Sequence, residues 1–229
     1  MEFSNKRILV VGASGALGAT ITSQLIAKGA TVLGTARSND SAGKIPNAVE
    51  VRLLLDYENK DSITTLTDYL NSTTELDGIV NAAGVVAFGK AVDTPQSILA
   101  TLMQTNAIGP MQLISELQPV LLASAQRGGE PFVLNLTGVV AELPMANMAG
   151  YSASKTAIGG YLQALGKEWR REGIRVLSVT PGHTETGLAT RAISGEAPAF
   201  PQGMTADHVA SIVLDALAND LKELPASAF

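Results

Sequence analysis

A glycine-rich turn between an apolar run and a helical pattern is the feature that most constrains the fold. Residues 8–11 read Ile-Leu-Val-Val, as expected for a strand buried on both faces of a parallel sheet. The turn Gly12–Gly18 (GASGALG) follows, and then a helical pattern through Ile21 and Leu25. Strand, glycine turn and helix in this order are typical of a dinucleotide site, where a diphosphate lies at the helix N-terminus. An ordinary strand-to-helix turn is the less favoured alternative.

Strand and helix patterns alternate along the rest of the chain. Strands are predicted at 31–35, 49–55, 76–80, 132–136 and 174–179, with a short further strand in the tail 222–229. Helices are predicted at 61–70, 95–126, 151–172 and 205–219, with Gly173 and Thr205 as caps. Asn106 and Gly109-Pro110 should kink the second of these helices. The alternation predicts an α/β fold, a Rossmann-type doubly wound parallel sheet of six or seven strands with helices on both faces.

Composition narrows the organisation and the classes of function. A length of 229 residues suits one α/β domain over 1–229, and a net charge of −5 argues against nucleic acid or an anionic membrane as partner. The absence of cysteine excludes disulfides and thiolate sites, and two isolated histidines make a metal site unexpected. The apolar run near the N-terminus is too short for a signal or membrane segment, so a cytoplasmic protein is expected.

Tyr151 and Lys155 form a candidate acid/base pair. They stand four residues apart at the start of a helical pattern and therefore share one face of the helix. A free tyrosine has a pKa of about 10, and an adjacent ammonium favours the phenolate, so the pKa of Tyr151 is expected to be lowered. Because this spacing also arises by chance, it needs support from other motifs.

Arg37 follows the second predicted strand, at the place that faces the adenosine ribose in a dinucleotide fold. An acid there selects NAD, whereas an arginine accommodates a 2′-phosphate. No acid stands between the end of this strand and Asp40. The sequence therefore predicts NADP(H) as the preferred cofactor, with NAD(H) possible; a solvated surface arginine is the alternative.

Taken together, these motifs resemble the short-chain dehydrogenase/reductase family over essentially the whole chain. The matching motifs, in order, are Gly12…Gly18, Asp56, Asn81-Ala82-Ala83-Gly84, Asn106, Tyr151-Ser-Ala-Ser-Lys155, and Pro181-Gly182 with Thr186. The resemblance implies hydride transfer between NAD or NADP and a carbonyl or alcohol carbon. It implies Tyr151 as general acid/base, Lys155 as the residue that lowers its pKa and binds the nicotinamide ribose, and Asn106 as the holder of a relay water.

The expected site can be stated residue by residue. The catalytic set is Tyr151, Lys155, Asn106 and Thr137. The cofactor-binding set is Gly12, Ser14, Gly15, Ala16, Leu17, Gly18, Arg37, Asp56, Asn81, Ala82, Ala83, Gly84, Tyr151, Lys155, Pro181, Gly182, Thr184 and Thr186. Within the family's pattern Asp56 would lie by the adenine, and Thr186 would meet the nicotinamide amide or the diphosphate.

The chain departs from the family's pattern in three ways. Its glycines read G-x-x-G-x-x-G rather than G-x-x-x-G-x-G, and it is short after Thr186, without the glycine-rich ending usual beside a tetramer interface. Most important, the family's catalytic serine falls at Gly138, thirteen residues before Tyr151. Losing one oxyanion donor typically costs about 10²–10³ in rate. The hydroxyl of Thr137, a backbone N–H or a bound water could replace it, and the sequence leaves this choice open.

These departures leave three functions to weigh. The favoured one is an NADP-dependent oxidoreductase acting on a small, mainly apolar carbonyl or alcohol. A cofactor-binding sensor or scaffold without catalysis is the runner-up, and an epimerase or dehydratase is the third.

Five residues, Phe88, Leu143, Met145, Met148 and Phe200, would form an apolar substrate wall or simply pack loops. His183 is interpreted as solvated rather than substrate-binding. The helix from Tyr151 has apolar residues around more than one face, so a homodimer is expected.

Overall fold

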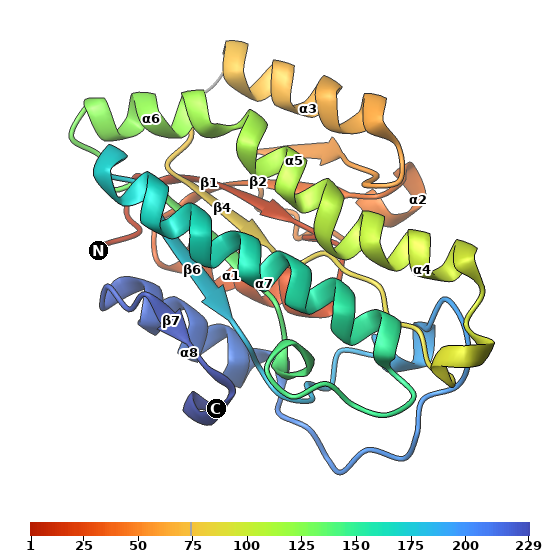
Figure 1. Cartoon of the computed structure of the whole chain (residues 1–229). Helices are drawn as coiled ribbons and strands as arrows, with labels where there is room; N and C mark the ends of the chain where they lie inside the picture. The colour runs from red at the N-terminus through yellow and green to blue at the C-terminus, as the bar shows by residue number, and fades with distance from the viewer. Residues whose placement is uncertain (74) are drawn as a thin grey trace.

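The computed structural model describes residues 1–73 and 75–229, which form one seven-stranded parallel sheet (Figure 1). Its strands are β1 (Arg7–Val11), β2 (Thr31–Ala36), β3 (Val51–Leu54), β4 (Gly78–Asn81), β5 (Phe132–Leu136), β6 (Arg175–Val179) and β7 (Glu223–Leu224). Their order in the sheet is β3-β2-β1-β4-β5-β6-β7. The predicted doubly wound sheet is confirmed, and the tail supplies its seventh strand by pairing with β6.

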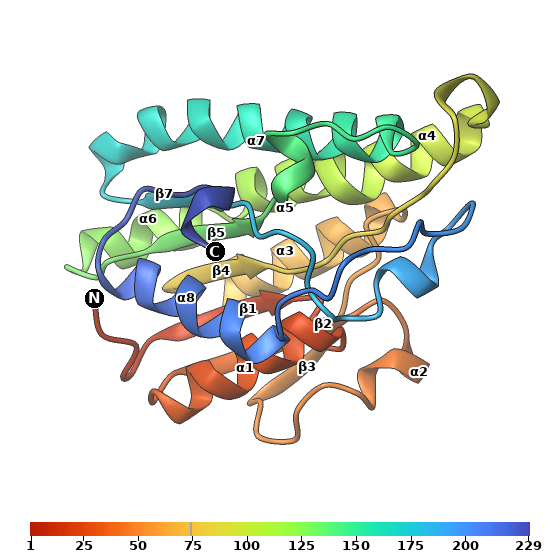
Figure 2. The same cartoon turned by 90° about the horizontal axis from the view of Figure 1, so that it is seen from below.

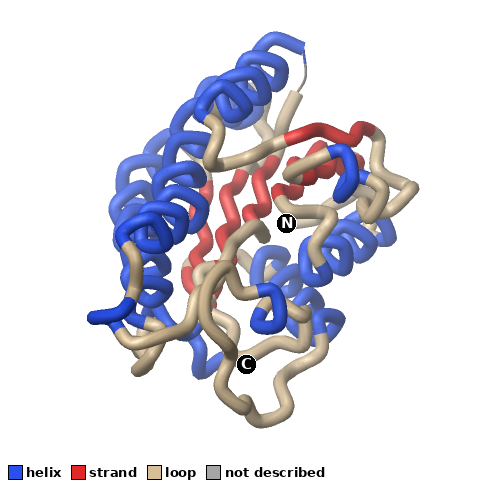
Figure 3. Tube along the Cα trace, turned by 90° about the vertical axis from the view of Figure 1, so that its right-hand side faces the viewer, coloured by secondary structure: helices blue, strands red, loops and turns tan. Residues whose placement is uncertain are grey.

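Helices cover both faces of the sheet, as Figures 2 and 3 show. One face carries α1 (Ala16–Ala27) and α8 (Ala206–Ala218). On the other side lie α3 (Lys60–Thr73), α4 (Gln96–Met103), α5 (Gly109–Glu116), α6 (Gln118–Gln126) and α7 (Ala149–Trp169). Single turns of 3₁₀ helix occur at Ala91–Asp93, Val139–Ala141, Arg170–Glu172, Ala189–Arg191 and Ala226–Ala228.

The core is divided by the sheet, because successive strand residues face opposite layers. Ile8 and Val10 of β1 pack in the cluster that contains α1 and α8. Leu9 and Val11 pack in the cluster beneath α3, α5 and α7. All four are at most 2% exposed, which explains why β1 reads as a continuous apolar run instead of an alternating one.

The kink predicted in the region 95–126 is a π-helical turn at Gln104–Ile108. Pro110 has no N–H to donate to the carbonyl of Asn106, and the N–H of Gly109 instead bonds to the carbonyl of Gln104, five residues back. A second break, at Leu117, separates α5 from α6 and was not predicted. Leu117 has φ −92° and ψ 2°, and a proline follows it in the first turn of α6.

Local capping explains most other boundaries. Gly173 adopts the left-handed conformation (φ 76°) that ends the region of α7, and the Thr205 hydroxyl accepts a hydrogen bond from the N–H of His208 at 3.2 Å. Both predicted caps are confirmed. The sequence reading missed the four-residue helix α2 (Asn39–Ala42), whose cap is a reciprocal pair of bonds between Ser38 and Ser41.

Two glycines of the first turn are required by close backbone approach. Gly12 has φ 77°, and a Cβ on it would lie 2.9 Å from the backbone nitrogen of Ala83 in the turn after β4. A Cβ on Gly18, in the first turns of α1, would overlap the carbonyl oxygen of Gly12. The start of α1 therefore packs directly on the turn after β1. That turn also contacts the turn after β4, at the boundary between the two strands.

This packing predicts that Gly18→Ala destabilises the protein by about 2 kcal/mol or more, because the methyl group forces apart two backbone segments. Gly43→Ala is the matched control, since Gly43 has φ −63° and a Cβ there would meet nothing within 4 Å. The control should be neutral or slightly stabilising. Urea unfolding of both variants checks this, and equal free energies of unfolding would contradict the assigned role of Gly18.

Candidate active site

A cavity of about 410 Å³ lies where the turns after β1, β4, β5 and β6 converge. Of the predicted residues, it is lined by Gly15, Ala16, Leu17, Gly18, Ala82, Thr137, Tyr151, Lys155, Pro181, Gly182, Thr184 and Thr186. Parallel strands bring their carboxyl ends to one edge, which is where open α/β sheets bind ligands. Motifs far apart in the sequence are thus assembled around one space.

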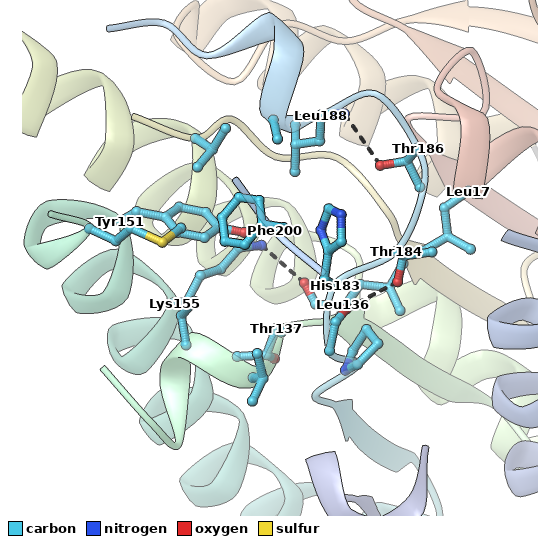
Figure 4. A pocket seen from close by; sticks show the side chains of 18 of the residues that line it. Leu17, Leu136, Thr137, Tyr151, Lys155, His183, Thr184, Thr186, Leu188 and Phe200 are labelled. Atoms are coloured by element: carbon cyan, nitrogen blue, oxygen red, sulfur yellow. Dashed lines mark hydrogen bonds between the residues drawn. The ribbon is translucent and has the colours of Figure 1, made fainter. Parts of the chain in front are cut away.

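Tyr151 and Lys155 lie one turn apart on α7 and both face the cavity (Figure 4). The Lys155 ammonium is 6.0 Å from the centroid of the Tyr151 ring and donates a hydrogen bond of 3.0 Å to the carbonyl of Leu136. Lys155 is 6% exposed. The Tyr151 hydroxyl makes no hydrogen bond to any described residue, so it is free for a ligand in the cavity.

Burial shifts the pKa values of both groups toward their neutral forms. It raises the pKa of Tyr151 to about 12 and lowers the pKa of Lys155 to about 8. The expectation that Lys155 lowers the pKa of Tyr151 is therefore wrong for the protein alone. The loss of hydration outweighs the attraction of an ammonium placed 6.0 Å from the ring centroid.

Asn106 lies within the π-helical turn, behind the cavity rather than on its wall. Its amide nitrogen donates to the carbonyl of Val85 at 2.9 Å and to the Ser154 hydroxyl at 3.0 Å, and its oxygen accepts from the N–H of Val85 at 2.9 Å. Gly84 leaves room beside it, because a Cβ there would lie 3.1 Å from the Asn106 oxygen and 3.3 Å from the Lys155 nitrogen. The side chain therefore ties the turn after β4 to α7.

The Thr137 hydroxyl belongs to a buried chain of hydrogen bonds that crosses the sheet. Tyr57 donates to Asn81 (3.1 Å), Asn81 to Asn135 (2.6 Å), and Asn135 to the Thr137 oxygen (3.1 Å). Thr137 and Ser178 then share a bond of 2.9 Å. Asn81, Asn135 and Ser178 are cross-strand neighbours in register. Thr137 thus forms part of the cavity wall, but its hydroxyl is already hydrogen-bonded to Asn135 and Ser178.

Gly138, where the sequence analysis expected the family's serine, has φ 91° and ψ 152°. A Cβ there would meet only the carbonyl oxygen of Pro181, at 4.0 Å, so the backbone conformation and not space requires glycine. The N–H groups of Thr137, Gly138 and Val139 bond to carbonyls of Val179 and Pro181. Within the described chain, the next N–H, that of Val140, has no hydrogen-bond partner.

The N-terminus of α1 is suited to an anion. Its N-cap residue is Gly15, no side chain caps the first turn, and no acidic residue stands in that turn. Backbone N–H groups at a helix start attract phosphate, and no side chain among the described residues competes for them here. Gly15, Ala16 and Leu17 line the cavity at this point. The residues present therefore fit the diphosphate of a dinucleotide.

Other predicted cofactor residues lie outside the cavity wall. Arg37 is exposed just after β2, and Asp56 lies after β3 and accepts a bond from the N–H of Glu58 at 3.0 Å. The Asn81 side chain points into the buried chain of hydrogen bonds. The remaining members of the set, Gly12, Ser14, Ala83 and Gly84, form the two turns without lining the cavity.

The outer half of the cavity is apolar. Phe88, Met145, Met148 and Phe200 line it as expected, whereas Leu143 is 64% exposed and does not. His183 also lines it: its ring stacks on Phe200 with centroids 4.8 Å apart, and its Nε2 lies 3.4 Å from a Glu185 carboxylate oxygen. His183 is therefore a residue of the cavity wall, with 31% of its side chain exposed.

The sequence reading missed several wall residues, among them Val86, Val140, Leu188 and Arg191. They belong to loops and to single 3₁₀ turns, which are too short for a regular periodicity, so hydrophobic spacing carries no signal for them. Among the described residues there is no group of three or more His, Cys, Asp or Glu that could hold a metal ion. Nor does any described helix have the length and apolar character needed to cross a bilayer.

The lowered pKa of Lys155 predicts how stability varies with pH. Between pH 8 and the ordinary pKa of 10.5, the unfolded chain keeps a proton that the folded protein has lost, so stability rises with pH in this window. Relative to Lys155→Met, the wild type should gain about 2 kcal/mol in free energy of unfolding from pH 7 to pH 10. Urea unfolding measures this gain, and parallel pH curves for the two proteins would contradict it.

Comparison with known proteins identifies the family. The short chain dehydrogenase family matches residues 6–197. The chain is 29% identical over 200 residues to "3-oxoacyl-[acyl-carrier-protein] reductase FabG" of Salmonella typhimurium, covering 86% of this chain and 80% of that relative. Among solved structures, a short-chain dehydrogenase from Streptomyces avermitilis superposes with a TM-score of 0.82 at 27% identity, covering 97% of this chain and 88% of the other. One from Burkholderia cenocepacia, in complex with NADP, gives 0.85 at 21% identity, covering 99% and 90%. This protein belongs to the short-chain dehydrogenase family.

Proposed function

We propose that this protein is an NADP-dependent oxidoreductase that transfers hydride between the nicotinamide and a carbonyl or alcohol carbon of a small, mainly apolar substrate. One observation carries the proposal. The free Tyr151 hydroxyl and the buried Lys155 ammonium face a cavity that joins an uncapped helix N-terminus to an apolar wall. One end suits a phosphate-bearing cofactor and the other a carbonyl compound.

Tyr151 supplies the proton in this proposal. With a pKa of about 12, the phenol is protonated at neutral pH and can donate to a substrate oxygen as charge develops there. The Lys155 ammonium adds positive charge beside that oxygen, held in place by the carbonyl of Leu136. Asn106 fixes the turn after β4 against α7 and so keeps the floor of the site rigid. Reduction of a carbonyl is the direction that this protonation state favours.

The cofactor would lie along the turns after β1, β4 and β6. When bound, its nicotinamide supplies or accepts the hydride. Gly15, Ala16 and Leu17 would hold the diphosphate at the start of α1, and Thr184 and Thr186 would meet the nicotinamide half. Arg37 stands beyond the end of β2, exposed and free to meet a 2′-phosphate. Similar structures from other organisms are described with NADP, NADPH and NADH bound, which supports a nicotinamide cofactor.

The donor that replaces the missing serine is, in this proposal, a main-chain group. Thr137 was the first candidate, but its hydroxyl is shared between Asn135 and Ser178. The N–H of Val140, three residues after Thr137, has no hydrogen-bond partner among the described residues, and Val140 lines the cavity. A backbone donor of this kind can stabilise an oxyanion as well as a hydroxyl does.

The apolar wall indicates a substrate with a hydrocarbon body. Phe88, Val140, Met148 and Phe200 belong to one packed cluster that also contacts Tyr151. Because relatives are named 3-oxoacyl-[acyl-carrier-protein] reductases, a 3-oxoacyl thioester belongs in any substrate panel beside simple ketones. Two other functions compete. A cofactor-binding sensor is favoured by Gly138, and an epimerase or dehydratase would use the same site without net turnover of the cofactor.

A homodimer is part of the proposal. Leu99 of α4 is 39% exposed and Ile108, between α4 and α5, is 48% exposed, beside the outer face of α7. A shared surface formed by these helices would cover both side chains. Sedimentation equilibrium giving the mass of a single chain would rule this out.

Turnover tests the proposal directly. Absorbance of the reduced nicotinamide should fall when the protein meets NADPH and a suitable ketone. Tyr151→Phe should abolish this change while leaving the dissociation constant for NADPH within a few-fold, because only the proton donor is lost. A Tyr151→Phe variant with the wild-type kcat would remove Tyr151 from this role. Tight NADPH binding without turnover over the whole panel would leave the sensor as the better reading.

Arg37 predicts cofactor preference. A charge-assisted contact with a 2′-phosphate is worth about 1.5–3 kcal/mol, which corresponds to roughly 10–150-fold in affinity. NADPH should therefore bind more tightly than NADH, and Arg37→Asp should narrow or reverse the difference. Calorimetry with both cofactors checks this. Equal dissociation constants in the wild type would remove the assignment of Arg37.

Two variants of the turn after β5 test the oxyanion donor. Thr137→Val should lower kcat less than ten-fold, since the lost hydroxyl serves Asn135 and Ser178 rather than the substrate. Gly138→Ser should not raise kcat and should cost about 1–3 kcal/mol of stability, because φ 91° strains any side-chain-bearing residue. A hundred-fold loss in Thr137→Val would assign the role to the hydroxyl instead.

A further inference from the structure

The side chains of the cavity wall that carry a full charge at neutral pH, Lys155 and Arg191, are both basic. Lys155, His183 and Arg191 line the cavity, whereas no aspartate or glutamate among the described residues does. The protein as a whole carries a net charge of −5, so this wall differs sharply from the average surface. A concave wall with only basic groups focuses a positive potential and attracts an anion.

Two of the three basic groups are already engaged. Lys155 bonds to the carbonyl of Leu136 deep in the site, and His183 pairs with the Glu185 carboxylate. Arg191 has no carboxylate partner among the described residues; its guanidinium makes a single bond of 3.3 Å, to the carbonyl of Thr186. A guanidinium has five N–H donors, so most of its capacity remains available to a ligand.

The segment that carries Arg191 is held over the cavity by main-chain bonds. The N–H of Ile193 bonds to the carbonyl of Val86, and the N–H of Phe88 to the carbonyl of Ser194, both at 2.9 Å. Gly195 permits this contact, because with φ 71° it brings the chain so close that a Cβ would overlap the carbonyl of Phe88. The backbone of this segment is thereby fixed before any ligand arrives, and the exposed Arg191 side chain is held by its bond to the carbonyl of Thr186. A fixed backbone reduces the entropic cost of using this residue.

We propose that Arg191 binds the diphosphate of the cofactor from the side opposite the helix α1. The glycine turn Gly12–Gly18 contains no lysine or arginine, so the chain's own phosphate cradle is uncharged. The bond to Thr186 anchors the guanidinium beside a cavity residue that is assigned to the nicotinamide and diphosphate region. This inference rests on the proposed function, and it adds a charged clamp supplied by the segment after β6.

Calorimetry at low salt with NADPH and NADH tests the clamp. Arg191→Ala should weaken both cofactors by the same factor, about ten-fold, because both contain the diphosphate. Arg37→Ala should weaken NADPH alone. Arg191→Ala should also reduce the dependence of the NADPH dissociation constant on salt, since one ion pair is lost. The control is Arg171→Ala, an exposed arginine in the 3₁₀ turn that follows α7, about 30 Å from Tyr151 at the rise of a helix, which should change neither constant.

Several results would overturn the clamp. Unchanged dissociation constants for both cofactors would do so, and a rise only in the KM of carboxylate-bearing substrates would place the anion on the substrate instead. Loss of NADPH binding alone would assign Arg191 to the 2′-phosphate. The calorimetric comparison reads cofactor binding alone and needs no turnover. A wild type that binds cofactor but turns over no substrate would therefore remove the proposed reaction and still allow the clamp to be tested. A wild type that binds neither cofactor refutes both.

Discussion

The contact between two backbone turns at the boundary of β1 and β4 is the constraint on which the rest of the structure depends. Gly12 lies against Ala83 there, and the chain leaves β1 toward one face of the sheet and β4 toward the other. The divergence of the two connections opens the space that the cavity occupies. Because the approach is between backbones, it needs residues without side chains, and this explains the small residues after both strands.

A buried chain of hydrogen bonds from Tyr57 to Ser178 supports the site from within the sheet. Each amide in that chain uses its oxygen toward one neighbour and its nitrogen toward the next, so the donors all run in one direction. Buried polar groups are costly unless every one is paired, and a fully paired chain is rigid. Asn135 and Thr137 flank Leu136, whose carbonyl holds the Lys155 ammonium. These hydrogen bonds thus help to fix the position of the Lys155 ammonium, although none of them is made to it.

The parts of this protein that could be predicted from sequence are those governed by local chemistry. The strands, the caps at Gly173 and Thr205, and the break near Pro110 follow from hydrophobic runs, side-chain hydrogen bonding and a missing N–H. The direction in which the pKa of Tyr151 shifts could not be predicted, because it depends on how deeply the fold buries this side chain. The partners of Thr137 lie up to forty-one residues away on β6, and Arg191 reaches the cavity only through a loop pinned to another loop.

The backbone at Gly138 bears on how this chain could change over evolutionary time. A serine placed there would find open space but an unfavourable φ, so one substitution cannot supply a hydroxyl without reshaping the turn. The turn is itself held by bonds from Thr137, Gly138 and Val139 to the strand end and turn of β6. An introduced hydroxyl would therefore need coordinated changes at the ends of two strands. The set of residues that this position accepts is limited by the main chain and not by the space around it.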